Sequence, residues 1–151
     1  MPQIEQSASV EMTEKLGAEL AKRMLEDPSL PPFVALYGDL GVGKTAFVRG
    51  FVSVVSPASA VRSPTFALVR EYPALPRPVF HFDCYRIDSE EDLVSIGFDD
   101  YLSRAGICLC EWSEKIADFL PPKRLEVTIL KDEPALPDHR CITITQKGET
   151  K

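Results

Sequence analysis

The sequence predicts a single α/β domain over residues 1–151, built on one mixed sheet flanked by helices. The sheet is expected to have a parallel core, an antiparallel pair and late antiparallel strands. Three observations carry this prediction. An apolar run leads through a glycine-rich loop into a helical pattern, which is typical of a parallel core. Two β-rich runs flank a proline-rich turn, and two alternating runs follow near the C-terminus.

The first half of the chain is predicted to run helix, strand, glycine loop, helix. Apolar or semi-polar residues recur every three or four positions over residues 10–24, and an Asp-Pro pair ends this helix. The run FVALY, residues 33–37, is apolar on both faces, like the central strand of a covered sheet. A second helical stripe covers residues 47–55 and contains Gly50, which costs up to about 1 kcal/mol relative to alanine.

The second half is predicted to consist of short elements. The runs TFALVREY and PVFHFDCY are extended segments joined by PALPRP, and we expect them to pair antiparallel. Ser89 stands three positions before Asp92, close to a capping box, and opens a short helix that Gly97 ends. ICLCEW predicts a buried strand, SEKIADFL a short helix, and RLEVTIL and RCITITQ late strands. The polar tail over about residues 146–151 is expected to fray.

The composition limits the classes of function. Lys and Arg number 17 against 23 Asp and Glu, which gives a formal net charge of -6 and leaves no broad cationic surface for nucleic acid. Any contact with nucleic acid is therefore expected to come through a partner. The four cysteines stand inside apolar runs, so they predict a reducing cytoplasm and no structural zinc. No secretory leader and no membrane-spanning run is visible, and a soluble cytoplasmic protein is expected.

The stretch GDLGVGKT, residues 38–45, matches the phosphate-binding pattern GxxxxGK followed by Ser or Thr, between a strand and a helix. The spacing lets backbone N–H groups converge on a phosphate, while Lys44 reaches the β and γ oxygens and the Thr45 hydroxyl ligates Mg²⁺. An ordinary glycine turn is the less favoured alternative. The expected nucleotide-binding residues of this stretch are Asp39, Leu40, Gly41, Val42, Gly43, Lys44, Thr45 and Ala46.

A nucleotide hydrolase also needs a carboxylate on the metal side, and two buried runs end in one. Asp83 follows VFHF and Glu111 follows ICLC. Either alone is more often a solvated strand end, but two of them beside a phosphate loop favour function. His81 is interpreted as a core or hairpin residue in preference to a catalytic histidine. Cys108 and Cys110 are interpreted as alternate positions on one strand face in preference to metal ligands.

Several branches of phosphate-loop proteins lack support. The chain has no NKxD or TKxD element for guanine and no LSGGQ-like stretch, and it is short for a nucleoside-monophosphate kinase. A small ATP-binding switch remains. The order GDLGVGKT, VRSPTFALV, HFDCYRI, EDLVSIGFDDYL and ICLCEWSEKI, over about residues 9–122, closely resembles the TsaE (YjeE) family. That family is the bacterial ATPase required for threonylcarbamoyladenosine modification of tRNA.

The resemblance implies a P-loop NTPase-like fold and a role for each matching residue. Lys44 resembles the phosphate lysine and Thr45 the magnesium ligand. Asp83 matches a required acidic position near the γ-phosphate, and Glu111 matches the acidic position that supports the metal. Both are therefore candidate metal ligands as well as catalytic residues. Trp112 is the family tryptophan next to that glutamate.

Further positions follow from the same resemblance. Ser63, Pro64 and Thr65 fall on a switch-like loop, where Pro64 keeps Ser63 extended and Thr65 is counted with the catalytic residues. Thr13 on the first helix resembles a position on the base side of the nucleotide. The chain departs from the family pattern at Cys84, where a bulkier aliphatic residue is usual, and after about residue 120.

The resemblance also implies partners. Family members act with TsaD and TsaB, and TsaD transfers the threonylcarbamoyl group to an adenosine beside the anticodon. This chain would then bind ATP or ADP with Mg²⁺, dock on that pair and reset it by hydrolysis, meeting tRNA only through the complex. Two alternatives stay open: a small-molecule kinase in which Asp83 is the base, and a nucleotide-sensing scaffold without turnover.

Overall fold

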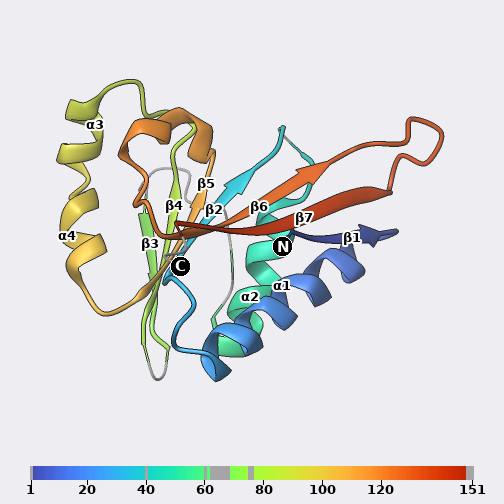
Figure 1. Cartoon of the computed structure of the whole chain (residues 1–151), viewed down its shortest axis with the longest axis horizontal. Helices are drawn as coiled ribbons and strands as arrows, with labels where there is room; N and C mark the ends of the chain where they lie inside the picture. The colour runs from blue at the N-terminus through green and yellow to red at the C-terminus, as the bar shows by residue number, and fades with distance from the viewer. Residues whose placement is uncertain (1, 40, 60, 62–68, 75–76, 149–151) are drawn as a thin grey trace.

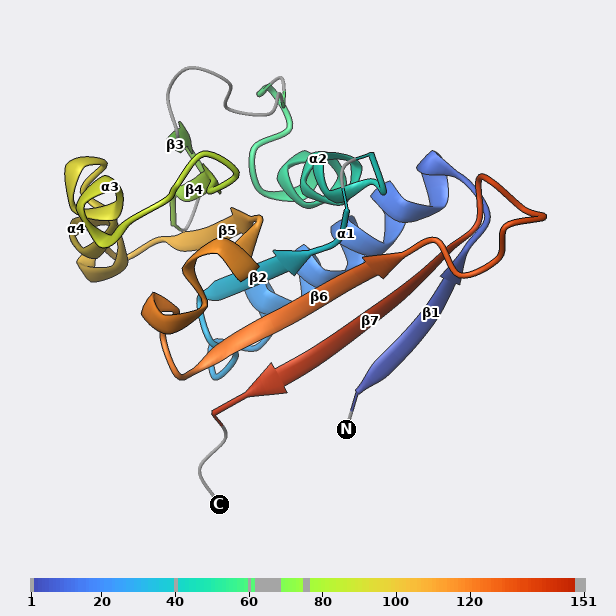
Figure 2. The ribbon, with the colours of Figure 1, turned by 90° about the horizontal axis from the view of Figure 1, so that it is seen from above.

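The computed structural model describes residues 2–39, 41–59, 61, 69–74 and 77–148. Within them, seven strands form one sheet in the order β1-β7-β6-β2-β5-β4-β3, with helices packed on both faces (Figures 1 and 2). The strands are β1 (Gln3–Ser7), β2 (Phe33–Tyr37), β3 (Val69–Tyr72), β4 (Val79–Asp83), β5 (Ile107–Glu111), β6 (Arg124–Leu130) and β7 (Arg140–Lys147). The helices are α1 (Val10–Glu26), α2 (Lys44–Val55), α3 (Glu90–Ser95), α4 (Phe98–Ser103) and the 3-10 helix η1 (Ser113–Phe119).

The sheet has the mixed character that the sequence predicts. Strands β6, β2, β5 and β4 are parallel to their neighbours in this central block. Strand β3 pairs antiparallel with β4, and β7 pairs antiparallel with both β6 and β1. The parallel core, the antiparallel pair and the late antiparallel strands are therefore confirmed.

The central strands are buried on both faces, and alternate residues feed two separate cores. In β2, Val34 and Leu36 face the core under α1 and α2, whereas Phe33 and Ala35 face the core under α3, α4 and η1. Cys108 and Cys110 share the second face of β5, as the sequence analysis predicts. This two-sided burial explains why the central runs are continuously apolar and do not alternate with polar residues.

Helices α1 and α2 lie side by side on one face of the sheet (Figure 2). Two glycines allow their close approach. A Cβ atom at Gly17 would stand 2.0 Å from the Phe47 carbonyl oxygen, and one at Gly50 would stand 1.8 Å from the Glu14 carbonyl oxygen. The helix-propensity cost of Gly50 is thus accompanied by a packing requirement that no other residue meets.

Three features differ from the sequence expectations. Strand β1 was not expected, because its sequence QIEQS has one apolar residue, Ile4, and that side chain is 62% exposed on an edge strand. The segment after Ser89 forms two short helices, separated by Gly97 at φ 75°. Gln146 and Lys147, which were expected to fray, belong to β7 and pair with β6; residues 149–151 lie outside the described part. Among the described helices, none is long and apolar enough to cross a bilayer.

Candidate functional site

The candidate site lies at the carboxyl ends of the parallel strands β2, β5 and β4. The strand register sets Glu111, the last residue of β5, between Leu36 of β2 and Asp83 of β4. The glycine loop leaves β2 at this edge and runs into α2. In open α/β sheets, ligands bind outside the carboxyl ends of the strands, and the predicted residues Asp83 and Glu111 lie there.

The glycine loop has the backbone that a phosphate cradle requires. Gly41 and Gly43 have φ angles of 79° and 114°, in the left-handed region that side chains disfavour. A Cβ atom at Gly41 would meet no atom of the described residues within 4 Å, so this part of the loop leaves room for a ligand. Helix α2 begins at Lys44 without a side-chain cap and without an acidic residue in its first turn. Its first N–H groups and its dipole therefore suit an anion such as a phosphate.

Lys44 is held in the site with little exposure. Its side chain is 4% exposed, donates a hydrogen bond to the Gly38 carbonyl oxygen and lies 3.4 Å above the centre of the Trp112 ring. Burial lowers the pKa of this amine below its ordinary value of 10.5. Four carboxylates oppose that shift, in the order Glu114, Glu111, Asp83 and Asp39. Within the described part of the chain, the one oxygen that this buried cation contacts is a carbonyl, so it is well placed to bind an anionic ligand.

Glu111 is the centre of a buried polar cluster. Its side chain is 3% exposed, and both carboxylate oxygens accept from the Thr45 hydroxyl, at 3.2 and 3.4 Å. One of these oxygens lies 2.5 Å from His81 Nε2. Because a carboxylate can only accept, the histidine N–H donates this bond. Thr45 and His81 therefore hold the Glu111 carboxylate from two sides.

His81 is the residue that sequence reasoning undervalued. It is a buried residue of β4, as predicted, with 0% exposure and its ring stacked on Tyr72 at 6.3 Å. Its direct bond to Glu111 nevertheless makes it part of the site. Among the described residues, its other ring nitrogen Nδ1 has no hydrogen-bond partner. The only signal in the sequence was its position two residues before Asp83, on the strand next to β5.

Asp83 occupies the neighbouring strand end. It is half-buried, and its Oδ1 accepts a hydrogen bond from the Tyr85 N–H at 3.0 Å. The structure thus brings Lys44, Thr45, Asp83 and Glu111 to one edge of the sheet. The other predicted site residues, Leu40, Ser63, Pro64 and Thr65, lie outside the described residues.

The residues present fit Mg²⁺ bound together with a nucleotide. Among the described residues, no group of three His, Cys, Asp or Glu side chains is arranged to hold a metal by itself. Mg²⁺ is commonly bound by one or two protein oxygens, substrate phosphates and water. The neighbouring side-chain oxygens of Thr45 and Glu111, beside a phosphate cradle, are consistent with this type of Mg²⁺ coordination.

Thr13 borders the other side of the glycine loop. Its hydroxyl is 2.8 Å from the Ser7 hydroxyl and donates to the Ser9 carbonyl oxygen, so it is bonded within the protein. Its methyl group faces Gly43, where a Cβ atom would stand 3.7 Å away. A cavity of about 80 Å³ opens there, and its wall includes Arg140, whose Nε donates to the Val42 carbonyl oxygen at 2.8 Å. The described cavity wall comprises Ser9, Val10, Thr13, Gly41, Val42, Gly43, Ala46, Asp138 and Arg140.

Comparisons with known proteins match the sequence to one family and the fold to a solved structure. A family model described as "Threonylcarbamoyl adenosine biosynthesis protein TsaE" matches residues 7–141. A relative from Bacillus subtilis named tRNA threonylcarbamoyladenosine biosynthesis protein TsaE is 39% identical over 115 residues, covering 76% of this chain and 70% of the relative. A protein of the same name from Haemophilus influenzae is 43% identical over 96 residues, covering 64% of this chain and 61% of the relative. The crystal structure of Bacillus subtilis YdiB superposes with a TM-score of 0.76 at 29% identity, covering 98% of this chain and 87% of that one.

Proposed function

The chain belongs to the TsaE family, and on this premise we propose that it is an ATPase that supports threonylcarbamoyladenosine formation on tRNA in the cytoplasm. The observation that carries the proposal is the cluster of Lys44, Thr45 and Glu111 around an open glycine loop. The name that the relatives share indicates the process, threonylcarbamoyladenosine biosynthesis, and the residues of the site support ATP hydrolysis as the reaction. The transfer of the threonylcarbamoyl unit itself is proposed to be carried out by a partner.

The proposed chemistry divides among named residues. Lys44 neutralises phosphate oxygens, because it is a buried cation beside the cradle. Thr45 and Glu111 hold Mg²⁺, which when bound offsets the negative charge of the reacting phosphate. His81 keeps the Glu111 carboxylate pointed at Thr45. Asp83, half-buried at the next strand end, is left to orient the attacking water.

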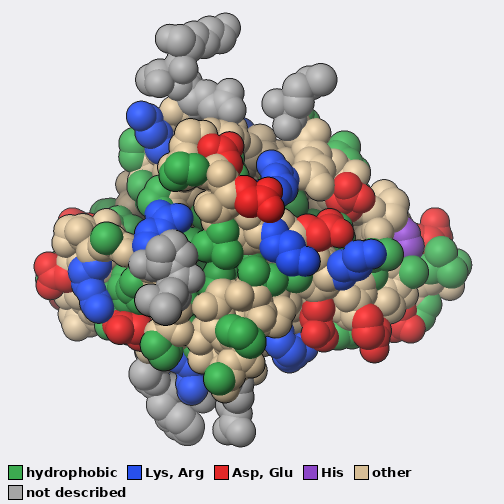
Figure 3. Space-filling view, turned by 90° about the horizontal axis from the view of Figure 1, so that it is seen from below, with side chains coloured by type: hydrophobic (Ala, Val, Ile, Leu, Met, Phe, Trp, Pro, Cys, Tyr) green, Lys and Arg blue, Asp and Glu red, His purple; other side chains and the backbone are tan. Residues whose placement is uncertain are grey.

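The proposed partners are TsaD and TsaB, and hydrolysis is proposed to reset their complex. A loop that is ordered by a γ-phosphate and released after hydrolysis is a general way to drive such a cycle. The face drawn in Figure 3 supports an indirect contact with tRNA. Lys and Arg side chains are interspersed there with Asp and Glu and form no continuous basic patch among the described residues.

Phosphate release from ATP and Mg²⁺ tests the proposal. The chain is assayed alone and then with its cognate TsaD and TsaB. Lys44→Ala is the blank, and Lys22→Ala is the matched control, because Lys22 is an exposed lysine of α1. We expect release that the partners stimulate, that Lys44→Ala abolishes and that Lys22→Ala retains. A rate of phosphate release that is unchanged by both partners would refute the role in this pathway. Phosphate found on a small-molecule product would identify a kinase.

A further inference from the structure

The negative charge of the chain is concentrated in one short segment. Residues 88–100 contain six acidic side chains and no Lys, Arg or His. Removing these six from the 23 acidic residues leaves 17, which equals the number of Lys and Arg in the chain. The whole formal charge of -6 therefore belongs to the α3–α4 segment. The acidic residues are Asp88, Glu90, Glu91, Asp92, Asp99 and Asp100.

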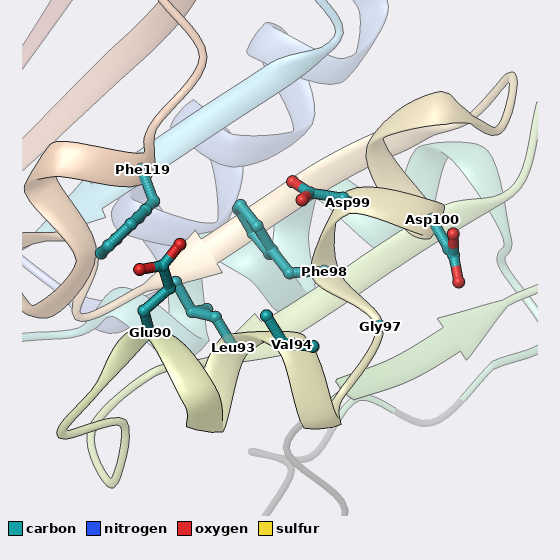
Figure 4. A pocket seen from close by; sticks show the side chains of 8 residues that line it. All are labelled: Glu90, Leu93, Val94, Gly97, Phe98, Asp99, Asp100 and Phe119. Atoms are coloured by element: carbon teal, nitrogen blue, oxygen red, sulfur yellow. The ribbon is translucent and has the colours of Figure 1, made fainter.

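A groove with an apolar floor opens within this acidic segment (Figure 4). Leu93 and Phe98 form the buried floor, at 4% and 2% exposure. Val94, 70% exposed, and Phe119 of η1, 41% exposed, stand at the rim. Figure 4 shows the Phe119 ring of η1 beside Glu90 of α3, with the Phe98 side chain extending from the start of α4 toward them. Two large apolar side chains thus stay in contact with water beside carboxylates.

The size of the groove selects the kind of occupant. Its volume is about 170 Å³, whereas pockets for small molecules and cofactors are typically about 300–1,000 Å³. A single long side chain from another protein is the better match. The rim adds a requirement for charge, because Glu90 and Asp99 line the groove and no partner within the described residues binds either carboxylate. Asp88, in contrast, already pairs with Lys115 at 3.4 Å.

We propose that this groove is a docking surface for a partner protein that presents an arginine or lysine next to an aliphatic side chain. The aliphatic side chain covers Val94. The stem of the basic residue lies on Phe98 and Phe119, where its charge also meets an aromatic ring, and its head reaches Glu90 and Asp99. Charge complementarity at such a rim sets the rate of encounter and excludes acidic partners.

The inference rests on the proposed function for the identity of the partner, which we take to be a component of the TsaD and TsaB pair. The docking surface itself is inferred from the residues of this chain and does not depend on which partner binds. The groove is adjacent to the phosphate site in sequence, because η1 begins two residues after Glu111 and ends at Phe119. A partner seated on Phe119 would therefore contact the segment that leaves the site.

The test measures the affinity of the full chain for the purified TsaD and TsaB pair by titration calorimetry. Glu90→Lys with Asp99→Lys reverses the charge of the rim, and Val94→Ser removes its apolar contact. Glu19→Lys with Glu26→Lys is the matched control, because it makes the same change of net charge on exposed positions of α1. Binding of a fluorescent ATP analogue to each variant checks that fold and phosphate site are intact.

We expect the rim reversal to weaken binding at least about 100-fold and Val94→Ser about 5- to 10-fold, while the control stays within about 2-fold of the parent. Groove variants that bind the pair like the parent would overturn this inference and leave the proposed function standing. If the parent protein does not bind the pair, the partner assignment is wrong both in this inference and in the proposed function. A dimer of the chain alone, seen by sedimentation and lost in Val94→Ser, would place a second copy in the groove and overturn the inference as well.

Discussion

Replacing His81 with phenylalanine tests whether this residue positions Glu111. The phenyl ring preserves the stacking on Tyr72 but removes the N–H that lies 2.5 Å from the Glu111 carboxylate. Glu111 is 3% exposed, and among the described residues only the Thr45 hydroxyl remains to donate to its carboxylate. A hydrogen bond to a charged group is worth about 1.5–3 kcal/mol, so we expect His81→Phe to lower the free energy of unfolding by about 2 kcal/mol.

The measurement is a double-mutant cycle in urea, with Glu111→Leu as the second substitution. In a protein of this size, about 2 kcal/mol corresponds to a fall of about 4–8 °C in Tm, which is easily resolved. Residues in direct contact show coupling energies of about 0.5–3 kcal/mol, so the two substitutions together should cost at least about 1 kcal/mol less than their sum. Costs that add within about 0.5 kcal/mol would refute the reasoning, because they would mean that the two side chains do not interact.

The same variant separates positioning from a merely structural role. His81 touches Glu111 but pairs with Leu109, two residues before the carboxyl end of β5, so the affinity for ATP should change little. The rate of hydrolysis with the partner pair should fall about 10- to 100-fold, because a misplaced catalytic group costs rate more than binding. Loss of ATP affinity in step with stability, without a further loss of rate, would show that His81 only holds the fold.

Three further predictions concern the phosphate lysine, the helix crossing and a buried tyrosine. Lys44→Met should raise the free energy of unfolding at pH 7 in the absence of nucleotide, because burial lowers the pKa of Lys44. In urea titrations, the difference in free energy of unfolding between this variant and the parent should narrow as the pH approaches 10.5. Thermal scans of the variant should show no rise in Tm with ATP and Mg²⁺. Gly50→Ala should lower the free energy of unfolding by at least about 3 kcal/mol despite its better helix propensity, because its Cβ would stand 1.8 Å from the Glu14 carbonyl oxygen; a stabilised variant in urea would contradict that crossing. Tyr37→Phe removes a 2.9 Å bond to Glu126 and should cost about 1–2 kcal/mol at pH 7. Since burial and that bond raise the pKa of Tyr37 to about 12, this cost should shrink above pH 10, where the unfolded tyrosine ionises first.

The features that the sequence predicts correctly are those encoded locally. The glycine loop, the two-sided strand β2 and the helical stripe of α2 follow one another in 23 residues, from Phe33 to Val55, and each has its own periodicity or turn chemistry. The caps of α3 are equally local: Ser89 accepts from the Asp92 N–H, and Gly97 follows the helix at positive φ. Local patterns of this kind need no knowledge of the neighbouring strands.

The features that the sequence does not reveal depend on pairing between distant segments. Strand β1 is stabilised by its ladder with β7, more than 130 residues away, and not by its own composition. The bond between His81 and Glu111 follows from the register of β4 against β5, in which His81 faces Leu109, two residues before Glu111. Gly50 looks unfavourable within its own helix and is required only because α1 crosses there. In each case the missing information is the identity of the neighbour, which periodicity cannot supply.

Trp112 joins the phosphate site to the acidic groove. It is the only non-glycine residue with a positive φ, 58°, in the part of the chain that the structure describes, a conformation that costs of order 1–3 kcal/mol. Three contacts hold it there. The Trp112 ring lies under Lys44 and packs on the Tyr85 ring, with 4.9 Å between the ring centres. The hydroxyl of the next residue, Ser113, donates to the Cys110 carbonyl oxygen at 2.7 Å. One of these contacts is the Lys44 amine, so under the proposed function a phosphate at the glycine loop would draw that amine away from the Trp112 ring. We therefore expect phosphate binding to change the surroundings of Trp112, the residue that directly precedes η1. Because Trp112 is the only tryptophan in the chain, its fluorescence reports that step directly.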